Sequence, residues 1–291
     1  MAGTAPRATA GGGDCSLMSR RLHLWQDTIQ TDVEMLGDGP PLVYLHGPWG
    51  LAPDLPFAEI LSADSTVHAP RFPGTSAGNP DAIHQLDSLH DLVLYYAEVL
   101  DRLELGSVTL VGHSVGGMLA CELAAAMPER VERLVLVDAI GLWRDDAPVR
   151  NWMIMPEDAL RTALFADPTG SVADAFFAQP AEPEHRADRI WALACTAKFI
   201  WPIPDKGLRR RIHRVRAASL VVWGKQDGIA PSAYAADFAQ HIAGARQVVI
   251  DQAAHLPHLE QPQLACAAIG DFLHDGRGHL GAVSPLSADS R

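Results

Sequence analysis

Cysteine is scarce in this chain, and its few cysteines show no paired spacing. They are Cys15, Cys121, Cys195 and Cys266. A disulfide framework or a structural zinc site would need closely spaced pairs, so neither is expected. The chain also lacks an apolar run long enough to span a membrane, and its N-terminal residues lack the apolar segment of a signal peptide. These absences predict a soluble, cytoplasmic protein.

Basic residues are the minority among the charged ones. The sequence has 23 Lys and Arg against 35 Asp and Glu, which gives a net charge of −12. Because phosphate backbones and anionic lipid surfaces attract basic proteins, neither nucleic acid nor a membrane is expected as a partner. The phosphate-binding patterns G-x-G-x-x-G and G-x-x-x-x-G-K-[ST] are absent as well. A small molecule is therefore the expected partner, and the sequence predicts no particular oligomeric state.

Apolar residues are abundant, at 48% of the chain, which is enough for one sizeable core. Residues 21–34 alternate between apolar and polar, as in an antiparallel hairpin at a sheet edge. Short β-branched runs predict buried strands, and segments of helical periodicity separate them. The strands are expected at 42–45, 66–69, 108–111, 134–137, 220–223 and 248–250. This alternation predicts an α/β fold, with a mostly parallel sheet and helices on both faces.

One region interrupts the alternation of strands and helices. Residues 141–216 contain many prolines and only short helical patterns, with no convincing strand. Such an insertion is expected to form a helical cap, or lid, above the carboxyl edge of the sheet. From the N-terminus, the sequence predicts a disordered extension (1–19), the first part of the core (20–140), the cap (141–216), the second part of the core (217–276) and a flexible C-terminal tail (277–291).

The stretch from Ser107 to Met127 carries the main chemical signal. A buried strand turns abruptly into a helix, and the turn reads Gly-His-Ser-Val-Gly, with Ser114 at its centre. The G-x-S-x-G pattern is typical of a nucleophile elbow. Such a turn presents the serine hydroxyl to a base, and it directs the next backbone N–H, that of Val115, at a developing oxyanion. A plain glycine-rich connection is the alternative interpretation.

Two later loops hold polar side chains that could assist the serine. Asp227 follows a buried strand, and His255 and His258 follow the last strand. Carboxyl ends of parallel strands share one edge, so these loops are expected near Ser114. Asp138 also ends a strand and is a second candidate acid. The spacing of His255 and His258 could suit a metal, but a third ligand is missing nearby and H-E-x-x-H is absent, so no metal or organic cofactor is expected.

The elbow, the Trp223–Asp227 segment and the Ala253–Pro262 segment, in this order and after a His46-Gly47 loop, resemble the α/β-hydrolase superfamily. The resemblance extends from Leu42 to His274, with the cap as its loosest part. It implies the α/β-hydrolase fold. It also implies that Ser114 is the nucleophile, His255 the base and Asp227 the acid of a catalytic triad.

The loop after His46-Gly47 departs from the family pattern. The second oxyanion donor of the family is usually the N–H of the next residue, and here that residue is Pro48, which has no N–H. A shifted loop would offer the N–H of Trp49 or Gly50 instead, and otherwise Val115 would act alone or with water. We predict Val115 and Trp49 as the oxyanion donors.

Aromatic residues gather in the predicted cap, where they could form the wall of an apolar pocket. The predicted substrate-binding residues are Trp49, Trp143, Trp152 and Trp201. The resulting prediction is a serine hydrolase that cleaves a small or medium apolar carboxylic ester, or a related acyl compound, through an acyl-enzyme on Ser114.

Three alternatives stay open. One is a carbon–carbon bond hydrolase of vinylogous diketo acids, of the meta-cleavage-product type. For that group the resemblance implies an aromatic residue directly after the catalytic histidine, where this chain has Leu256. The others are a peroxide-using perhydrolase of the same fold and a non-catalytic protein that uses the pocket to bind a ligand.

Overall fold

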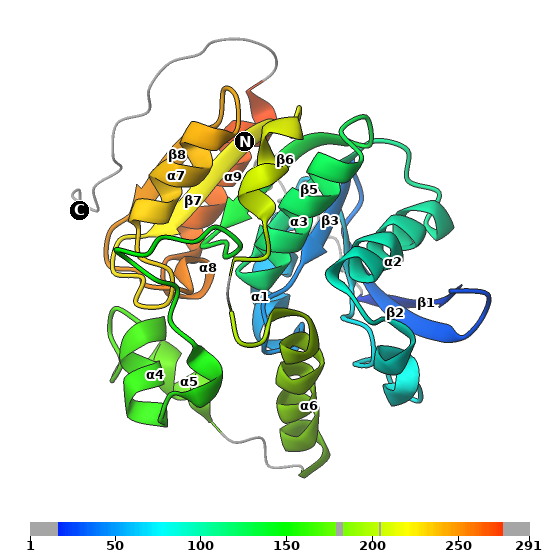
Figure 1. Cartoon of the computed structure of the whole chain (residues 1–291), viewed down its shortest axis with the longest axis horizontal. Coiled ribbons are helices and arrows are strands. Elements are labelled where there is room, and N and C mark those ends of the chain that lie inside the picture. Colours follow the sequence, from blue (N-terminus) through cyan, green and yellow to red (C-terminus); the bar gives the residue numbers. More distant parts are fainter. Residues whose placement is uncertain (1–16, 179–182, 204, 276–291) are drawn as a thin grey trace, which may run out of the picture.

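A single eight-stranded sheet forms the centre of the molecule (Figure 1), with the strand order β1-β2-β4-β3-β5-β6-β7-β8. The computed structural model describes residues 17–178, 183–203 and 205–275, without the side chains of residues 183–185. The strands are β1 (Met18–Leu24), β2 (Ile29–Leu36), β3 (Pro41–Leu45), β4 (Thr66–Pro70), β5 (Val108–His113), β6 (Val131–Val137), β7 (Ala218–Gly224) and β8 (Arg246–Ile250).

Strands β3 to β8 pair in parallel, while β1 and β2 form an antiparallel hairpin at one edge. The prediction of a mostly parallel α/β sheet is therefore confirmed. The register aligns the carboxyl ends of the central strands, because Leu45 pairs with Gly112 and His113 pairs with Val137. The loops that follow β3, β5 and β6 therefore leave the sheet at the same edge.

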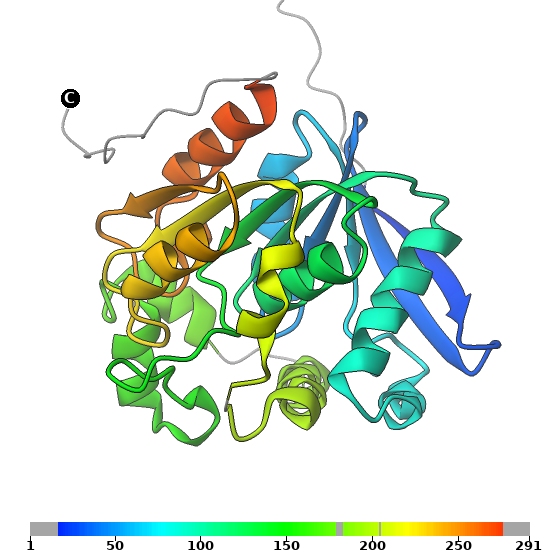
Figure 2. The same cartoon turned by 45° about the horizontal axis from the view of Figure 1, so that its top comes forward.

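Helices cover both faces of the sheet (Figure 2). On one face lie α2 (Leu89–Arg102), α3 (Val115–Ala126) and α7 (Ala233–His241), and on the other lie α1 (Leu55–Leu61) and α9 (Pro262–His274). Consecutive strand residues point to opposite faces. Accordingly, Leu110 belongs to the larger apolar cluster under α2 and α3, and Val111 belongs to the smaller cluster under α1 and α9.

Helices occupy the segment between β6 and β7, and no strand occurs among its described residues. They are η3 (Trp152–Ile154), α4 (Glu157–Leu164), α5 (Ser171–Phe177), α6 (Pro183–Ile200), η4 (Leu208–Arg210) and η5 (Ile212–Arg214). The expectation of only short helical patterns is wrong for α6, which has 18 residues. Helices α4, α5 and α6 lie beyond the carboxyl edge of the sheet, at the bottom of Figure 1. This segment therefore covers the edge at which the loops after β3, β5 and β6 emerge.

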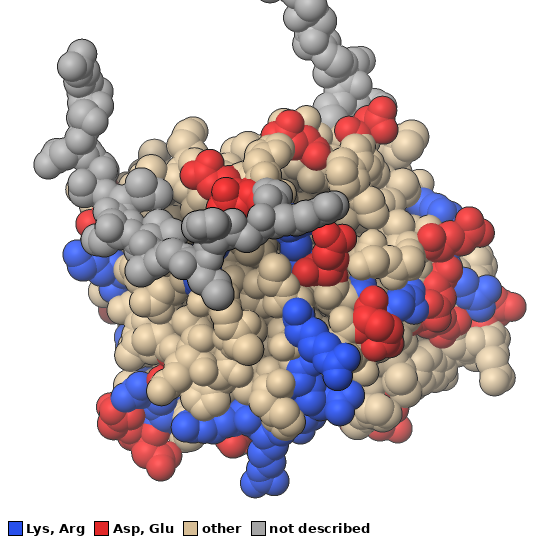
Figure 3. Space-filling view, turned by 90° about the horizontal axis from the view of Figure 1, so that it is seen from above, with Lys and Arg blue, Asp and Glu red and all other residues tan. Residues whose placement is uncertain are grey.

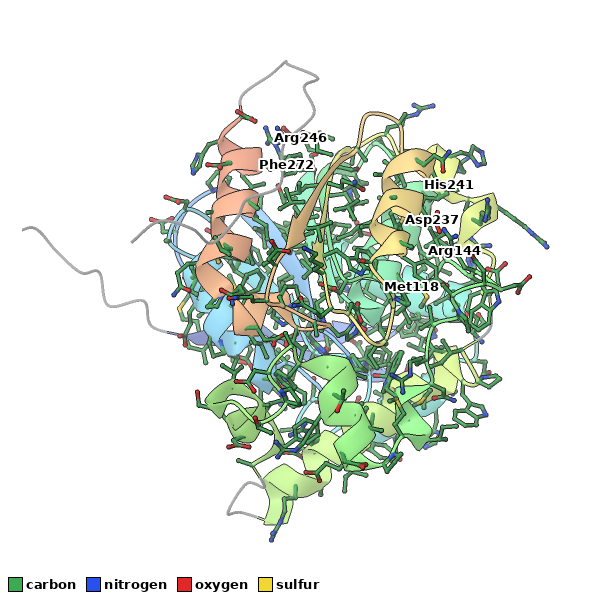
Figure 4. All side chains as sticks on the ribbon, turned by 90° about the vertical axis from the view of Figure 1, so that its left-hand side faces the viewer. Met118, Arg144, Asp237, His241, Arg246 and Phe272 are labelled. Carbon is green, nitrogen blue, oxygen red and sulfur yellow. The ribbon has the colours of Figure 1, made fainter. Side chains whose placement is uncertain are left out.

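Polar contacts attach this segment to the core. The Arg144 guanidinium donates to both carboxylate oxygens of Asp237 on α7, at 3.1 and 3.2 Å (Figure 4). Closer to the sheet edge, the Glu260 carboxylate accepts the N–H groups of Ala166 and Ala254, each at 2.7 Å. Glu260 belongs to α8 (Pro257–Glu260), so it links the end of α4 to the loop before α8.

The predicted terminal segments fall mainly outside the described residues. Residues 1–16 of the expected extension and all of the expected tail, 277–291, are in this group. Met18 and Ser19, which the prediction placed in the extension, belong to β1 and pair with Met35 and Glu34. The first strand therefore begins two residues earlier than the predicted start of the core.

The surface carries charges of both signs. On the face opposite α4, α5 and α6, small groups of Lys and Arg side chains are separated by groups of Asp and Glu (Figure 3). Within the described part of the chain, the helices are too short or too polar to cross a lipid bilayer.

Candidate active site

The turn between β5 and α3 holds Ser114 in a strained backbone conformation. Its φ of 54° and ψ of −114° lie in a region that non-glycine residues rarely adopt. Its N–H donates to the Val137 carbonyl at 2.9 Å, and its carbonyl accepts the N–H of Ile140 at 3.2 Å. These bonds to the end of β6 hold the strained turn in place.

Gly116 allows the start of α3 to pack directly against the end of β3. A Cβ atom at this position would lie 2.0 Å from the Leu45 carbonyl oxygen and 2.7 Å from that of His46. No side chain fits in this space, so the position requires glycine. The close approach brings the Val115 N–H next to the loop that begins at His46.

Three side chains from separate loops form one line of hydrogen bonds. His255 Nε2 lies 2.9 Å from Ser114 Oγ, and His255 Nδ1 lies 2.9 Å from Asp227 Oδ2. The other oxygen of Asp227 accepts the N–H groups of Ile229 and Ala230 at 2.7 and 2.9 Å. With a proton on Nδ1, the imidazole donates to Asp227 and leaves Nε2 free to accept the serine proton.

The two predicted oxyanion donors belong to the start of α3 and to the loop after β3. Val115 N–H is at the N-terminus of α3, where the helix dipole favours negative charge. Among the described residues, neither the Val115 N–H nor the Trp49 N–H has a hydrogen-bond acceptor. Pro48, between Gly47 and Trp49, has no N–H to donate.

A second buried polar network lies beside the first. The Asp54 carboxylate accepts the Tyr44 hydroxyl at 3.0 Å, the Gly47 N–H at 3.2 Å and a ring nitrogen of His258 at 3.2 Å. His113 Nε2 lies 2.9 Å from the His255 carbonyl oxygen, to which it donates. The network therefore joins the loop after β3, the elbow and the loop that carries His255.

Sequence reasoning missed Asp54. The only signal available was one carboxylate in a Pro- and Leu-rich loop, eight residues after His46. Burial alone raises the pKa of Asp54, but the hydrogen bond and charge of His258, together with His113 and His46, outweigh burial and leave that pKa well below its usual range. Burial, followed by the charge of His258, keeps the pKa of His113 well below its ordinary value.

Two sets of side chains have the composition of metal ligands, but their surroundings do not favour a metal. One ligand atom from each of Asp54, His113 and His258 lies within 4.8 Å of the others, and the same holds for Asp138, Asp227 and His255. In the first set, the backbone of Gly47 occupies the space beside His113 Nδ1, since a Cβ there would lie 2.6 Å from that nitrogen. In the second set, His255 and Asp227 already bond to each other. We assign no metal to either set.

A cavity of about 780 Å³ lies between the loop after β3 and the helices α5 and α6. Its wall is largely apolar and includes Trp49, Leu51, Phe176 and Leu259, together with Arg71 and Arg189. Ser114 and His255 are fully buried and do not line it. Trp49 belongs to both regions, because its ring lines the cavity and its centroid lies 6.4 Å from that of the His255 ring.

The four tryptophans predicted to bind substrate occupy different positions. Trp152 is buried against Trp49, with ring centroids 6.3 Å apart, and supports the cavity wall from behind. Trp143 borders a separate small cavity and donates to Asp145, while Trp201 is 50% exposed. Of the four, only Trp49 lines the large cavity in the described part of the chain. The positions of Trp143 and Trp201 therefore give no support to substrate binding by these two residues.

Known proteins resemble this chain over most of its length. Pimeloyl-(acyl-carrier protein) methyl ester esterase of Vibrio parahaemolyticus is 29% identical over 273 residues, which cover 89% of this chain and 100% of that protein. The 2-hydroxymuconate semialdehyde hydrolase of a Pseudomonas species is 29% identical over 270 residues, which cover 84% and 90% of the two chains.

A solved structure shows the same fold. The 2-hydroxy-6-oxo-6-phenylhexa-2,4-dienoate hydrolase of a Rhodococcus species superposes with a TM-score of 0.70 at 19% identity, over 89% of this chain and 99% of that one. The relatives are an ester hydrolase and a semialdehyde hydrolase, so the prediction of a hydrolytic enzyme is confirmed. The chain also matches the model of the alpha/beta hydrolase family over residues 42–269, and it belongs to that family.

Proposed function

We propose that the protein is a serine ester hydrolase in which Ser114, His255 and Asp227 form the catalytic triad. The observation that supports this most strongly is the pair of 2.9 Å contacts that joins Ser114 Oγ through the His255 ring to Asp227 Oδ2. A hydroxyl, an imidazole and a carboxylate in this order can move one proton along one line. The esterase relatives support the same assignment.

The chemistry follows from the geometry of these groups. As Ser114 Oγ attacks the ester carbonyl, its proton passes to His255 Nε2, and Asp227 stabilises the imidazolium through the bond to Nδ1. His255 then gives that proton to the leaving alkoxide, which departs as the alcohol. Water repeats the sequence on the acyl-enzyme and releases the acid. The N–H groups of Val115 and Trp49 are proposed to bind the oxyanion in both steps.

We further propose that the acyl group of the substrate occupies the cavity beside Trp49. A volume of about 780 Å³ suits a small or medium acyl chain, and the apolar wall favours one without charge near the ester. Ser114 is fully buried, so the substrate can reach the hydroxyl only if the neighbouring helices or the Trp49 side chain, which lies beside the His255 ring, move.

Covalent labelling tests the proposed nucleophile. A fluorophosphonate probe should modify the native protein at Ser114 and should leave Ser114→Ala unmodified. Hydrolysis of p-nitrophenyl esters of increasing chain length should then give kcat/KM values that rise and fall with the fit of the acyl chain to the cavity. A native protein that resists the probe while still binding ligands in the cavity would instead be a non-catalytic binding protein.

A cation in the cavity favours the carbon–carbon bond hydrolase as the second candidate. Arg189 lines the cavity, donates to the Phe176 carbonyl and lies over the Phe176 ring at 4.3 Å. Asp188 lines the same cavity, but no ion pair joins Arg189 to it or to another carboxylate among the side chains that the structure describes. A substrate carboxylate could supply the missing partner. Turnover of a vinylogous diketo acid without turnover of any ester would favour this candidate over the esterase.

A further inference from the structure

Asp138 lies directly beside the proposed triad. One carboxylate oxygen of Asp138, one of Asp227 and a ring nitrogen of His255 all lie within 4.8 Å of one another. Asp138 is fully buried at the end of β6, and its φ of 43° lies in the left-handed region. Strained backbone of this kind persists only where the surrounding structure imposes it. The position of Asp138 thus depends on the elements that hold the triad.

The two oxygens of Asp138 have different surroundings. Oδ1 accepts the Gly224 N–H at 2.9 Å, whereas Oδ2 is buried and has no hydrogen-bond partner among the described residues. On the neighbouring residue, Asp227 Oδ2 accepts from His255 and Oδ1 accepts two backbone N–H groups. An unpaired buried carboxylate oxygen is costly. A protonated Oδ2 could instead donate to the Asp227 carboxylate, which has lone pairs to spare.

The charges around Asp138 also favour a proton on it. The titratable groups that face it are Asp227, Glu260 and His255, and no Lys or Arg pairs with it among the described residues. Burial, and then the charge of Asp227, raise the pKa of Asp138 well above its usual range. In a buried site without a nearby cation, two adjacent carboxyl groups are more stable with one negative charge between them than with two.

We propose that Asp138 is a positioning residue that stays protonated at Oδ2 and donates a hydrogen bond to the Asp227 carboxylate. The inference rests on the proposed function of the triad. The bond would hold Asp227 in line with His255. It would also stabilise the negative charge of Asp227, so that His255 holds its own proton less tightly and acts as a base at lower pH.

Two substitutions at this position separate the proposal from its rivals. Asp138→Asn keeps an acceptor for the Gly224 N–H and an N–H donor toward Asp227, but cannot carry charge. Asp138→Leu removes both. With p-nitrophenyl butyrate as substrate, the acidic limb of the kcat/KM profile should stay in place for Asp138→Asn. For Asp138→Leu it should move to higher pH by roughly one unit, because the imidazolium gains stability when Asp227 loses a donor.

Other outcomes would overturn the proposal. If Asp138 were ionised, Asp138→Asn would remove a negative charge beside His255, and the acidic limb would move to lower pH. If Asp138 only held Gly224, Asp138→Leu would lose stability and activity while its acidic limb stayed in place.

A spectroscopic measurement covers the case in which Asp138→Leu does not fold. The native protein should show the infrared carbonyl band of a buried protonated carboxyl group, and Asp138→Asn should lack it. Absence of this band from the native protein would contradict the proposal. Labelling of Ser114 by fluorophosphonate reports on the triad separately. If the native protein is labelled at Ser114 but the acidic limbs of the Asp138 variants do not behave as expected, only the role of Asp138 is rejected. If the native protein is not labelled, the proposed function itself is rejected.

Discussion

Asp227 with His255 and Asp54 with His258 are two buried aspartate–histidine pairs whose histidines lie three residues apart in the chain. In both pairs a ring nitrogen lies close to a carboxylate oxygen, at 2.9 Å in the first and 3.2 Å in the second. The second ring nitrogen differs. In His255 it reaches the Ser114 hydroxyl, and in His258 it is buried with no partner in the part of the chain that the structure describes.

The difference teaches that an aspartate–histidine pair is not by itself a sign of catalysis. His258 packs edge-on against Phe57, and its ring centroid lies 4.3 Å from that of His113. The His258 ring is therefore surrounded by other buried rings. Asp54 joins the loop after β3 to the loop that carries His255. We infer that the first pair handles protons and the second holds loops together.

Removal of the two histidines should give the largest contrast. His255→Ala should lower kcat by roughly a millionfold, because the serine loses its base. His258→Ala should leave Ser114 able to react with a fluorophosphonate and should mainly lower the free energy of unfolding. Steady-state kinetics and chemical denaturation of both variants measure this contrast. A loss of kcat in folded His258→Ala as large as that in His255→Ala would remove the distinction.

Substitution of the two aspartates sharpens the comparison. Asp227→Asn should reduce kcat by about ten-thousandfold, since the wrong histidine tautomer is favoured, with little change in folding. Asp54→Ala leaves the Tyr44 hydroxyl, the Gly47 N–H and the His258 ring unpaired. It should therefore lower the free energy of unfolding by about 3 kcal/mol. Esterase assays measure the change in kcat, and urea unfolding monitored by tryptophan fluorescence measures the change in the free energy of unfolding. Together they show which aspartate affects catalysis and which affects stability.

The second network should also make folding sensitive to acid. Burial lowers the pKa of both His46 and His113, so in the folded protein these rings take up protons only at a lower pH than in the unfolded chain, where they do so below about 6.5. The free energy of unfolding should therefore fall as the pH drops through that value.

A further loss is expected at lower pH from Asp54, whose lowered pKa adds stability that is present above a pH of about 4 and is lost below it. Asp54→Asn should be less stable than the native protein at neutral pH, with a flatter dependence below pH 4. Unfolding curves at a series of pH values test this, and equal slopes for both proteins would contradict the role assigned to Asp54.

Substitution of Pro48 should have the smallest effect. Pro48→Ala adds the N–H that the family pattern places after His-Gly. If the Trp49 N–H already binds the oxyanion, kcat on a p-nitrophenyl ester should change by less than about tenfold. An increase of about a hundredfold would mean that the native site lacks its second donor, since one such donor is typically worth that much. Pro48→Ser also adds the N–H but has a different side chain, so equal rates for Pro48→Ala and Pro48→Ser would assign the effect to the N–H and not to loop packing.

Much of the fold could be predicted from local patterns. The run Val108–Val111 and the glycines around Ser114 predict a strand and a sharp turn from residues that are adjacent in sequence. The structure extends the strand to His113 and begins α3 at Val115, because the serine itself adopts the strained conformation of positive φ that separates the two elements. The edge hairpin was likewise predictable from alternation, although its first strand begins at Met18.

Predictions from residue type were weaker in the segment between β6 and β7. Trp143 and Trp201 are residues of a type common in pocket walls. Of the four tryptophans predicted to bind substrate, however, only Trp49, from the loop after β3, lines the large cavity in the described part of the chain. Aromatic residues serve a local core as readily as a binding surface, and helical periodicity in short, proline-interrupted segments does not say which face meets the sheet edge.

The sequence by itself determined the order of strands and helices, the elbow at Ser114 and the presence of Asp227 and His255 in loops that follow strands. These features depend on residues close together in the chain. Only the tertiary structure decided that Asp54 bonds to His258, that Asp138 lies beside Asp227 and that Trp49 lies between the cavity wall and the His255 ring, as a neighbour of both. Each of these contacts joins segments far apart in sequence. Sheet register and helix packing set the distances between such segments, and local sequence patterns do not predict them.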